Sequence, residues 1–596
     1  MTKQLLSGNE AFARGAWEAG VAFAAGYPGT PSTEILENVA AHYKDDIYCE
    51  WSPNEKVAFE AAAGASFTGV RTLTTMKHVG LNVAADPLMT LAYIGAVGGF
   101  VAIVADDPGM HSSQNEQDTR QYARFAKIPI FDPSDSNDAK EFVKLAYEVS
   151  EQFNTPVIVR STTRVSHSRG LVTTNDRVPA KKADFVKEPP RFVPIPMWAR
   201  QMRVRVEERL GKLQAAASQS PVNTIEWADK KFGVITCGVS YQYVRETFPN
   251  VSVLKLGWVY PFPEALIRKF AAEIENVLVI EEGDDFIEGY VKSLGIVCRG
   301  KPLFSLYGEL SPDALVTAIA NDIENNTANK QSVSLSSLTV QTTPKKQPLK
   351  TALPQLPARP PVLCPGCPHR GVFHALGRFD VVVTGDIGCY SLGVMPPLSR
   401  MDTILCMGGG ISLAHGIDKV NNTKKVVGMV GDSTFFHSGM TGLLDIAYNK
   451  GGSTIIVVDN RITAMTGHQD NPGSGKTLMG DTTNEASIEE IGKACGIKNI
   501  RTIEPRDIKN AVATLKEAID SNEAWLIVSK APCPLHLRKP LGPPLKVDEA
   551  ICKKCNACLK LGCPGLEKAG NQITINQYLC AGCEMCKNVC PAKAIT

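Results

Sequence analysis

The chain has 596 residues, 44% of them hydrophobic, which is enough for several buried cores and predicts three or four domains. Its 63 basic and 61 acidic residues nearly cancel, so no strong field is available to gather nucleic acid or an anionic membrane surface. The first residues lack the long apolar core of a signal peptide, and the long uncharged run over residues 88–105 is split by Gly98 and Gly99 into a helix and a buried strand. We therefore expect a cytoplasmic protein with no membrane span and no nucleic-acid partner.

The first 330 residues predict two α/β domains. Residues 1–185 alternate Ala- and Gly-rich helical segments with short apolar runs, the pattern of a doubly wound domain. Within them, NEKVAFEAAAGASFTG predicts a helix that opens at Glu55 and carries Gly64 further along. Over residues 186–330, the strand-like runs VITCG, VLKLG and VLVIEE are separated by helix-length segments, which predicts a second, smaller domain.

A linker and a third α/β unit follow. Residues 331–360 are rich in Ser, Thr, Pro and Lys without an apolar period, which predicts an extended linker. The third unit is predicted over residues 361–540. In its segment GDSTFFHSGMTGLLDIAYNKGGSTIIVVDN, Gly-Asp follows one buried strand and Asp-Asn follows a second. Any α/β domain can end two strands in this way, but the spacing is also the pattern of thiamine diphosphate sites.

In such sites a Mg²⁺ ion on the diphosphate takes hard oxygen ligands at the carboxyl ends of parallel strands. We therefore predict Asp432 and Asn460 as side-chain ligands and Ile462 as a carbonyl ligand. Residues that would approach the diphosphate lie in glycine-containing turns, namely Gly408, Gly409, Gly410, Gly431 and Ser433. Ser433 stands where the usual pattern has a glycine.

Thiamine chemistry also needs a buried glutamate that protonates the aminopyrimidine ring of the cofactor. Glu55 at the predicted helix start, with Gly64 beyond it, fits the arrangement found in thiamine enzymes. An exposed helix glutamate would give the same local pattern. Glu60, on a different face of the helix, is the alternative.

Eight of the 17 cysteines lie in the last 45 residues, within a predicted domain over 541–596, as CKKCNACLKLGCPG and CAGCEMCKNVCPA. Three thiolates at two-residue gaps followed by a cysteine before proline is the bacterial two-cluster ferredoxin pattern, in which the fourth cysteine of each half binds the other cluster. We assign one [4Fe–4S] cluster to Cys552, Cys555, Cys558 and Cys590, and the second to Cys580, Cys583, Cys586 and Cys563. Zinc is the alternative, but it has no use for the third and fourth cysteines of each half.

Further motifs carry a family resemblance. The segment GNEAFARGAWEAGVAFAAGYPGTPSTEI resembles the first domain of the 2-oxoacid:ferredoxin oxidoreductases, and CPGCPHRG, GDIGCYSLG and AMTGHQ resemble their diphosphate domain. The order of the domains resembles the large subunit of the indolepyruvate:ferredoxin oxidoreductases. The resemblance implies a multidomain thiamine diphosphate-binding α/β fold with doubly wound parallel sheets and a C-terminal α+β two-cluster ferredoxin domain.

The same resemblance implies roles for individual residues. The threonine of the family's YPxTPS motif, which faces the substrate, corresponds to Thr30. Related enzymes hold a third cluster near the thiamine, and its four cysteines correspond to Cys364, Cys367, Cys389 and Cys533. Buried thiols are common in protein cores, and CxxC also occurs in zinc and redox motifs, so these alternatives stay open.

The residues expected to contact the substrate match the family less closely than those expected to bind the cofactor. Related pyruvate enzymes place an arginine for the substrate carboxylate where this chain has GAVGGFVAIVADD. Lys77 and His78 are the candidates for that charge, while Gly98 and Gly99 would enlarge the pocket for an aryl group. His111 and Arg120 are further candidates for the border of the site.

The resemblance implies oxidative decarboxylation of aryl 2-oxoacids to acyl-CoA, with coenzyme A as co-substrate and ferredoxin as electron acceptor. It also implies a smaller partner subunit and an α₂β₂ assembly, because no domain is left in this chain to complete the site. Two alternatives remain: a non-oxidative thiamine-dependent decarboxylase whose clusters are structural, and a non-catalytic electron-transfer subunit. The first would make no acyl-CoA, and the second would bind no thiamine.

Overall fold

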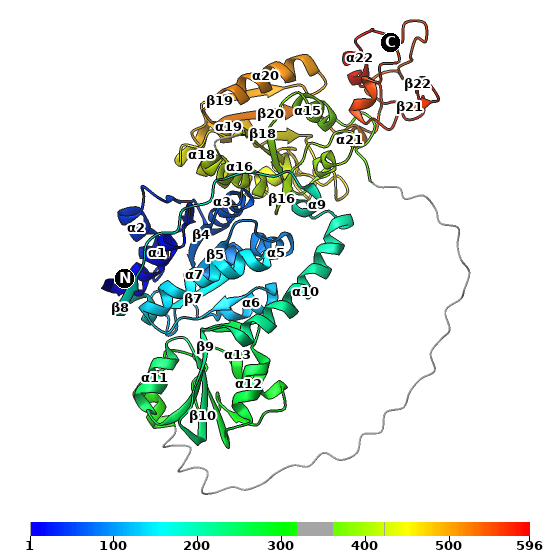
Figure 1. Ribbon diagram of the computed structural model, residues 1–596. Coiled ribbons are helices and arrows are strands. Elements are labelled where there is room, and N and C mark those ends of the chain that lie inside the picture. Colours follow the sequence, from blue (N-terminus) through cyan, green and yellow to red (C-terminus); the bar gives the residue numbers. More distant parts are fainter. Residues whose placement is uncertain (1, 319–360, 422–423) are drawn as a thin grey trace, which may run out of the picture.

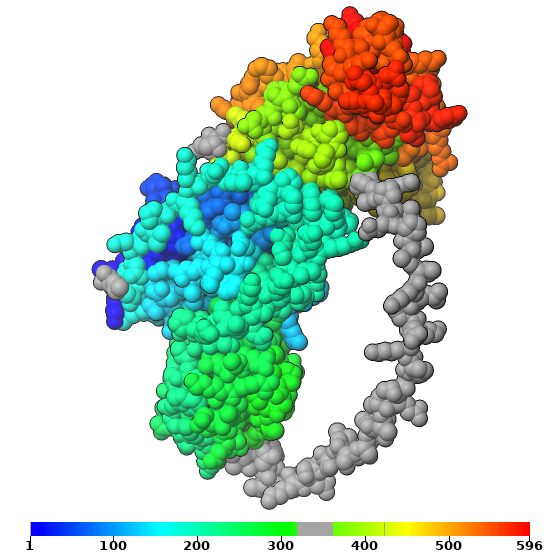
Figure 2. Space-filling model, turned by 45° about the vertical axis from the view of Figure 1, so that its right-hand side comes forward, coloured from blue at the N-terminus to red at the C-terminus, as the bar shows by residue number. Residues whose placement is uncertain are grey.

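The computed structural model describes residues 2–318, 361–421 and 424–596, so the predicted linker over 331–360 lies outside the described residues. Figure 1 shows the units in a row, with the middle unit at one end, the first unit in the centre, and the third unit and the C-terminal tail at the other end. Figure 2 shows the first and middle units packed closely together along their shared side. No helix among the described residues has both the length and the apolar character needed to cross a membrane.

The first unit is built on a seven-stranded sheet in the order β12-β6-β7-β5-β4-β2-β3, parallel except where β12 joins β6. A separate antiparallel pair joins β1 to β8. Strands β4, β5 and β7 are buried throughout, as expected of continuous apolar runs covered on both faces. Its elements are β1 (Thr2–Ser7), α1 (Gly8–Glu18), β2 (Phe23–Gly26), α2 (Thr33–His42), β3 (Tyr48–Trp51), α3 (Glu55–Phe67), β4 (Thr72–Lys77), α4 (His78–Val83), α5 (Ala85–Ile94), β5 (Phe100–Asp106), α6 (Thr119–Ala126), β6 (Ile130–Phe131), α7 (Ser136–Phe153), β7 (Val157–Thr162), α8 (Thr163–His167) and β8 (Arg169–Thr174).

The middle unit has a five-stranded sheet in the order β14-β13-β10-β11-β9, and it lends β12 to the sheet of the first unit. The long helix α10 begins with proline at its first turn and lies along the first unit, where Arg209 donates to the Ala92 carbonyl. The elements are α9 (Pro189–Phe192), α10 (Pro196–Gln219), β9 (Asn223–Glu226), β10 (Asp229–Cys237), α11 (Ser240–Thr247), β11 (Val251–Leu256), β12 (Trp258–Tyr260), α12 (Glu264–Ala271), β13 (Asn276–Ile280), α13 (Phe286–Ser293) and β14 (Cys298–Arg299).

The third unit has a six-stranded, fully parallel sheet in the order β16-β15-β17-β18-β20-β19. The predicted doubly wound pattern is therefore present here as well. Its elements are α15 (His369–Leu376), β15 (Val382–Gly385), η1 (Cys389–Val394), β16 (Thr403–Ile404), α16 (Gly409–Val420), β17 (Val426–Gly431), α17 (Asp432–Thr434), η2 (Phe435–Gly439), α18 (Met440–Tyr448), β18 (Thr454–Asp459), α19 (Ile488–Ala494), β19 (Asn499–Ile503), α20 (Ile508–Asp520), β20 (Trp525–Lys530) and α21 (Pro534–Leu537).

The tail is small, and its cysteines contribute to its own apolar cluster. Strands β21 and β22 pair antiparallel, and Val547 pairs with Ile595 near the chain end. The elements are η3 (Cys558–Leu561), β21 (Leu566–Ala569), β22 (Gln572–Ile575) and α22 (Met585–Asn588).

Helices α3 and α16 join the first unit to the third. Both are rich in Ala and Gly, which allows their backbones to approach closely. A Cβ atom on Gly64 would lie 2.4 Å from the Leu413 carbonyl oxygen, and one on Gly416 would lie 1.8 Å from the Ala61 carbonyl oxygen. The glycine predicted beyond Glu55 therefore makes this helix contact possible.

Candidate functional site

The two motif residues of the third unit lie at neighbouring strand ends. Asp432 directly follows β17 and Asn460 directly follows β18, and the two parallel strands are paired up to Gly431 and Val458. Both side chains are buried and line a cavity of about 120 Å³, together with Ile462. The structure thus brings the three predicted magnesium ligands to one cavity.

The environment of Asp432 suits a cation. Burial and the nearby Asp459 raise the pKa of Asp432 to about 6, and its Oδ2 accepts a hydrogen bond of 3.0 Å from the side chain of Asn471. The Asn460 Oδ1 accepts from the Ile462 N–H at 3.2 Å. A buried carboxylate beside an amide oxygen is a donor set of the hard type that Mg²⁺ prefers, so these residues fit the ion on a diphosphate.

A glycine turn lies beside this cavity. Gly408 has a positive φ of 82°, and a Cβ there would lie 2.2 Å from Ser438 Oγ, so only glycine fits. Its N–H donates to Asp386 Oδ2, and burial raises the pKa of Asp386 well above its ordinary value. Gly409 and Gly410 begin α16, and a Cβ on Gly410 would meet the Met429 carbonyl oxygen at 2.8 Å. Close packing is enough to explain why these positions are glycines. That their backbone also approaches the diphosphate of the cofactor stays a prediction.

Glu55 is the first residue of α3, as predicted, and its carboxylate lies against Gly80. Burial raises its pKa, and within the described part of the chain it has no ion pair and no hydrogen bond to another residue. Glu60 is different: it pairs with Lys56 and accepts from Cys406 Sγ at 3.0 Å. Lys56 also donates to the Met407 carbonyl at 2.9 Å. Glu55 is thus free to exchange a proton with a ligand, whereas Glu60 belongs to the joint between units.

The predicted substrate residues Thr30, Lys77 and His78 lie on the first unit, and none of them lines the cavity of Asp432. Thr30 is exposed, and its carbonyl accepts from Ser112 Oγ at 3.1 Å. Lys77 donates to the Ser112 carbonyl at 2.7 Å and lies 3.9 Å from Asp107. Burial lowers the pKa of Lys77. His78 is buried between the carbonyls of Ala105 and Asn115, at 3.4 and 3.1 Å from its ring nitrogens, so the fold alone accounts for it.

The remaining residues predicted near the substrate take part in packing and in ion pairs. A Cβ on Gly98 would lie 1.9 Å from the Val70 carbonyl oxygen and one on Gly99 would lie 2.8 Å from the Tyr147 ring, so these glycines permit packing instead of enlarging a pocket. The side chain of Arg120 is buried in ion pairs with Asp118 and with Glu281 of the middle unit. His111 lies 3.3 Å from Glu309, also of the middle unit.

Four cysteines predicted for a third cluster come together at the wall of the cavity. After the larger effect of burial, the Cys533 thiol raises the pKa of Cys364, and the thiols of Cys364 and Cys533 raise the pKa of Cys389. Burial raises the pKa of Cys367 to about 12, and Cys364 and Cys389 add to this. Cys389 itself lines the 120 Å³ cavity. Thiols close enough to affect one another's ionisation fit a metal cluster, because bound iron would balance the negative charges of the four thiolates.

Seven of the eight tail cysteines lie near others of their predicted sets, whereas Cys555 is exposed. Burial raises the pKa of Cys558, with smaller contributions from Cys590 and Cys552. Burial likewise raises the pKa of Cys583 and Cys586, with contributions from Cys563 and Cys580. Backbone N–H groups of Leu545 and Ala594 donate to the sulfurs of Cys580 and Cys590 at 3.4 and 3.3 Å, as is usual around cluster thiolates.

One buried arginine joins the four-cysteine group to the tail. The Arg370 Nη1 donates to the Leu561 carbonyl at 3.0 Å and to the Gly562 carbonyl at 2.5 Å. Its Nε donates to the Cys364 carbonyl at 3.3 Å. Burial lowers the pKa of Arg370. Thiols of the tail and of the four-cysteine group raise it in part, and the largest of these contributions comes from Cys563 in the tail. The tail set containing Cys563 is therefore the one next to the third unit.

Comparisons with known proteins agree with this site. Residues 14–205 match the family described as pyruvate flavodoxin/ferredoxin oxidoreductase, thiamine diP-binding, and residues 386–529 match the C-terminal TPP-binding domain of thiamine pyrophosphate enzymes. The chain is 38% identical to indolepyruvate oxidoreductase subunit IorA of Archaeoglobus fulgidus, over 100% of this chain and 97% of that protein. It is 40% identical to the subunit of the same name from Methanothermobacter thermautotrophicus, over 100% and 97%, and to that from Pyrococcus abyssi, over 99% and 96%.

The chain belongs to the IorA family. It is therefore part of an enzyme, an oxidoreductase with two thiamine diphosphate-binding domains, and the predicted family is confirmed.

Three residues of this IorA-family site were not predicted. Asp386 holds the glycine turn, Asn471 orients Asp432, and Arg370 joins the tail. A signal for Asp386 was present, since GDIG places Gly-Asp after an apolar strand just as GDST does. Asn471 lies in a segment with no regular spacing to that motif, and Arg370, although it belongs to CPGCPHRG, meets the tail only in the folded chain.

A buried ionic cluster lies at the joint between the two thiamine domains of this IorA-family chain. The His415 Nε2 lies 2.9 Å from Glu50 Oε2 and 3.8 Å from Asp445 Oδ2, and Tyr48 donates to Glu50 at 2.6 Å. Burial, the largest influence, lowers the pKa of His415, but Glu50 more than compensates, so the net pKa is raised. Burial and Glu50 raise the pKa of Asp445 to about 7. His415 and Asp445 therefore bind their protons more tightly in the folded protein than in the unfolded chain.

Proposed function

We propose that the chain is the larger subunit of an enzyme that oxidatively decarboxylates aryl 2-oxoacids, indolepyruvate among them, with coenzyme A. The aryl 2-oxoacid and the thiol yield acyl-CoA, carbon dioxide, one proton and two electrons. Each of two oxidised ferredoxins takes one electron. The relatives' names carry the words indolepyruvate oxidoreductase, and the family assignment supports the same reaction class here.

The observation that carries the proposal is the continuity from cavity to tail. Cys389 is both a wall of the cavity that holds Asp432 and a member of the four-cysteine group. Arg370 then spans the short distance from Cys364 to the tail. Three predicted clusters would thus form a path that starts at the cofactor, and a non-oxidative decarboxylase would have no use for such a path.

Thiamine diphosphate, when bound, supplies the stabilisation of negative charge at the carbon that loses carbon dioxide. Asp432, Asn460 and the Ile462 carbonyl would hold its Mg²⁺. Glu55 holds a proton at its carboxylate more readily than an exposed glutamate, which suits a group that protonates the aminopyrimidine. Lys77 stays the candidate for the substrate carboxylate, with Thr30 beside it and His78 as the alternative.

The partner in this proposal is a smaller β subunit, with two copies of each chain. Thr30 and Lys77 contact Ser112 on the first unit but do not line the 120 Å³ cavity formed by the described residues of the third unit. A second copy would place a third unit against them, because thiamine sites form between paired domains. We expect ferredoxin to accept electrons from the tail, in the cytoplasm.

The test is anaerobic purification of both subunits together, with thiamine, iron and sulfide quantified and a screen of 2-oxoacids. We expect arylpyruvates to give acyl-CoA and reduced ferredoxin in a ratio of one to two. Release of aldehyde without ferredoxin reduction would favour the decarboxylase. Absence of thiamine in active preparations would favour an electron-transfer subunit.

A further inference from the structure

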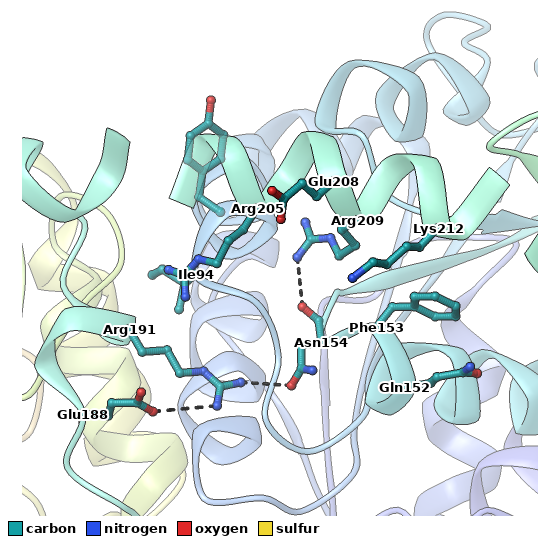
Figure 3. Close-up of a pocket in the computed structure, with 11 residues that line it drawn as sticks. Ile94, Gln152, Phe153, Asn154, Glu188, Arg191, Arg205, Glu208, Arg209 and Lys212 are labelled. Carbon is teal, nitrogen blue, oxygen red and sulfur yellow. Dashed lines mark hydrogen bonds and ion pairs between the residues drawn. The ribbon is translucent and has the colours of Figure 1, made fainter. Parts of the chain in front are cut away.

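A basic cavity of about 460 Å³ lies between the first unit and α10 (Figure 3). Figure 3 shows Arg205, Arg209 and Lys212 extending from α10, with Arg191 and Glu188 across the cavity. Four cations and two carboxylates, those of Glu188 and Glu208, line it, so its walls carry a net charge of +2. The four cationic residues of the lining are Arg191, Arg205, Arg209 and Lys212.

The guanidinium groups of this basic cavity are poorly neutralised. Arg209 is half-buried, and among the described residues it donates only to the carbonyls of Ala92 and Asn154, while its buried Nε has no partner there. Burial and the neighbouring Arg205 lower the pKa of Arg209 to about 10. Arg191 lies 4.0 Å from Glu188, and within the described residues neither Arg205 nor Arg209 forms an ion pair. A bound anion would supply the negative charge that these guanidinium groups lack as a partner.

The basic cavity leads toward the thiamine site. Tyr93 lines both the basic cavity and a neighbouring cavity of about 690 Å³, whose walls are mostly apolar. Three residues then line both this apolar cavity and the 120 Å³ cavity of Asp432, namely Ile387, Met407 and Met465. Consecutive cavities therefore offer a positively charged end, an apolar middle and an end at the thiamine cavity.

We propose that the basic cavity binds the phosphorylated adenosine end of coenzyme A, and that the apolar cavity holds its arm with the thiol directed toward the thiamine cavity. The inference rests on the proposed function, because it places that reaction's co-substrate. Coenzyme A is the reactant with several phosphate charges at one end and a long arm that carries the reacting thiol at the other. An arylpyruvate has one carboxylate and needs no second cationic cavity.

The test uses the complete two-subunit enzyme with Arg205→Ser, Lys212→Ser and the double variant. Both side chains are exposed, so folding should be preserved. Arg200→Ser is the matched control, since Arg200 is an exposed arginine of the same helix that does not line the cavity. We expect the KM for coenzyme A to rise about tenfold in each single variant and about a hundredfold in the double variant. The KM for the arylpyruvate should not change in these variants. In the Arg200→Ser control, the KM for coenzyme A should stay at the wild-type value.

Calorimetry with adenosine 3′,5′-bisphosphate, which carries phosphates but no arm, tests the basic cavity without catalysis. We expect it to bind the wild type and to lose binding in the double variant. Equal binding in both, or an equal change in the Arg200→Ser control, would overturn the proposal. Weaker subunit assembly on size exclusion, with an unchanged KM for coenzyme A when the smaller subunit is supplied in excess, would also overturn the proposal and would make this a surface for an acidic partner. If the wild type forms no acyl-CoA yet binds the bisphosphate in this way, the proposed function fails while the anion site stands.

Discussion

Replacing Arg370 with glutamine should release the tail from the third unit. The guanidinium is buried and donates two hydrogen bonds across the joint, to the carbonyls of Leu561 and Gly562. Glutamine is shorter and uncharged, so it keeps polarity but reaches neither carbonyl in the same geometry. The two acceptors would be left without their charged donor.

The size of the effect follows from these two bonds. A hydrogen bond to a charged group contributes about 1.5 to 3 kcal/mol, so the joint should lose about 3 to 6 kcal/mol. That corresponds to a shift of roughly 10²- to 10⁴-fold in the equilibrium between docked and undocked tail. Other contacts would remain, among them the hydrogen bond of 2.9 Å from the Asn588 side chain to the Arg506 carbonyl.

Two measurements check this prediction. Limited proteolysis of the segment that leads into the tail, residues 538–546, should become faster in Arg370→Gln. After arylpyruvate is added to the iron-loaded enzyme, stopped-flow absorbance should show slower reduction of the tail clusters, because electron transfer slows steeply with distance. Iron content should stay at the wild-type level, since every cysteine is retained.

Arg378→Gln is the matched control, because it removes an exposed arginine of the same unit that makes no hydrogen bond to the tail among the described residues. We expect it to behave as the wild type in both assays. An Arg370→Gln enzyme with wild-type proteolysis and wild-type tail reduction would refute the role given to this side chain.

Four further results are expected. Glu55→Gln should retain thiamine but release almost no carbon dioxide, whereas Glu60→Gln should mainly lower the melting temperature; normal turnover in Glu55→Gln would move the catalytic role to Glu60. Removal of residues 541–596 should preserve decarboxylation, stop ferredoxin reduction and leave about four irons per chain, the number of one cubane, while no remaining iron would exclude the four-cysteine cluster. His415 and Asp445 both have raised pKa values, so the stability they provide is present at low pH and is lost as the pH rises from the ordinary pKa of each group through its raised one, which for Asp445 means from 3.8 to about 7; the melting temperature should fall over that range, and an equal slope in Asp445→Asn would contradict this. The chain purified without a smaller subunit should form no acyl-CoA, and full activity from it alone would show that no partner is needed.

Much of the site could be predicted from the sequence because its ligands stand at the ends of local elements. Apolar runs define β17 and β18, and the polar residues directly after them, Asp432 and Asn460, must lie at one edge of a parallel sheet. Glu55 is placed by the start of its helix, and the side chain of Asn54 caps that start by accepting from the Val57 N–H. The tail cysteines are likewise grouped by their spacing.

Other features depend on contacts between segments far apart in the chain, which no spacing encodes. His78 looked available for a substrate, but its ring nitrogens lie against the carbonyls of Ala105 and of Asn115 in a distant loop. Glu50 and His415 are 365 residues apart and meet only because α3 packs on α16. The basic cavity forms where α10 crosses the first unit. Local spacing along the sequence determined which residues end each strand and helix, whereas the packing of whole faces decided which side chains are free to react, because hydrogen bonds and burial are fixed only when those faces meet.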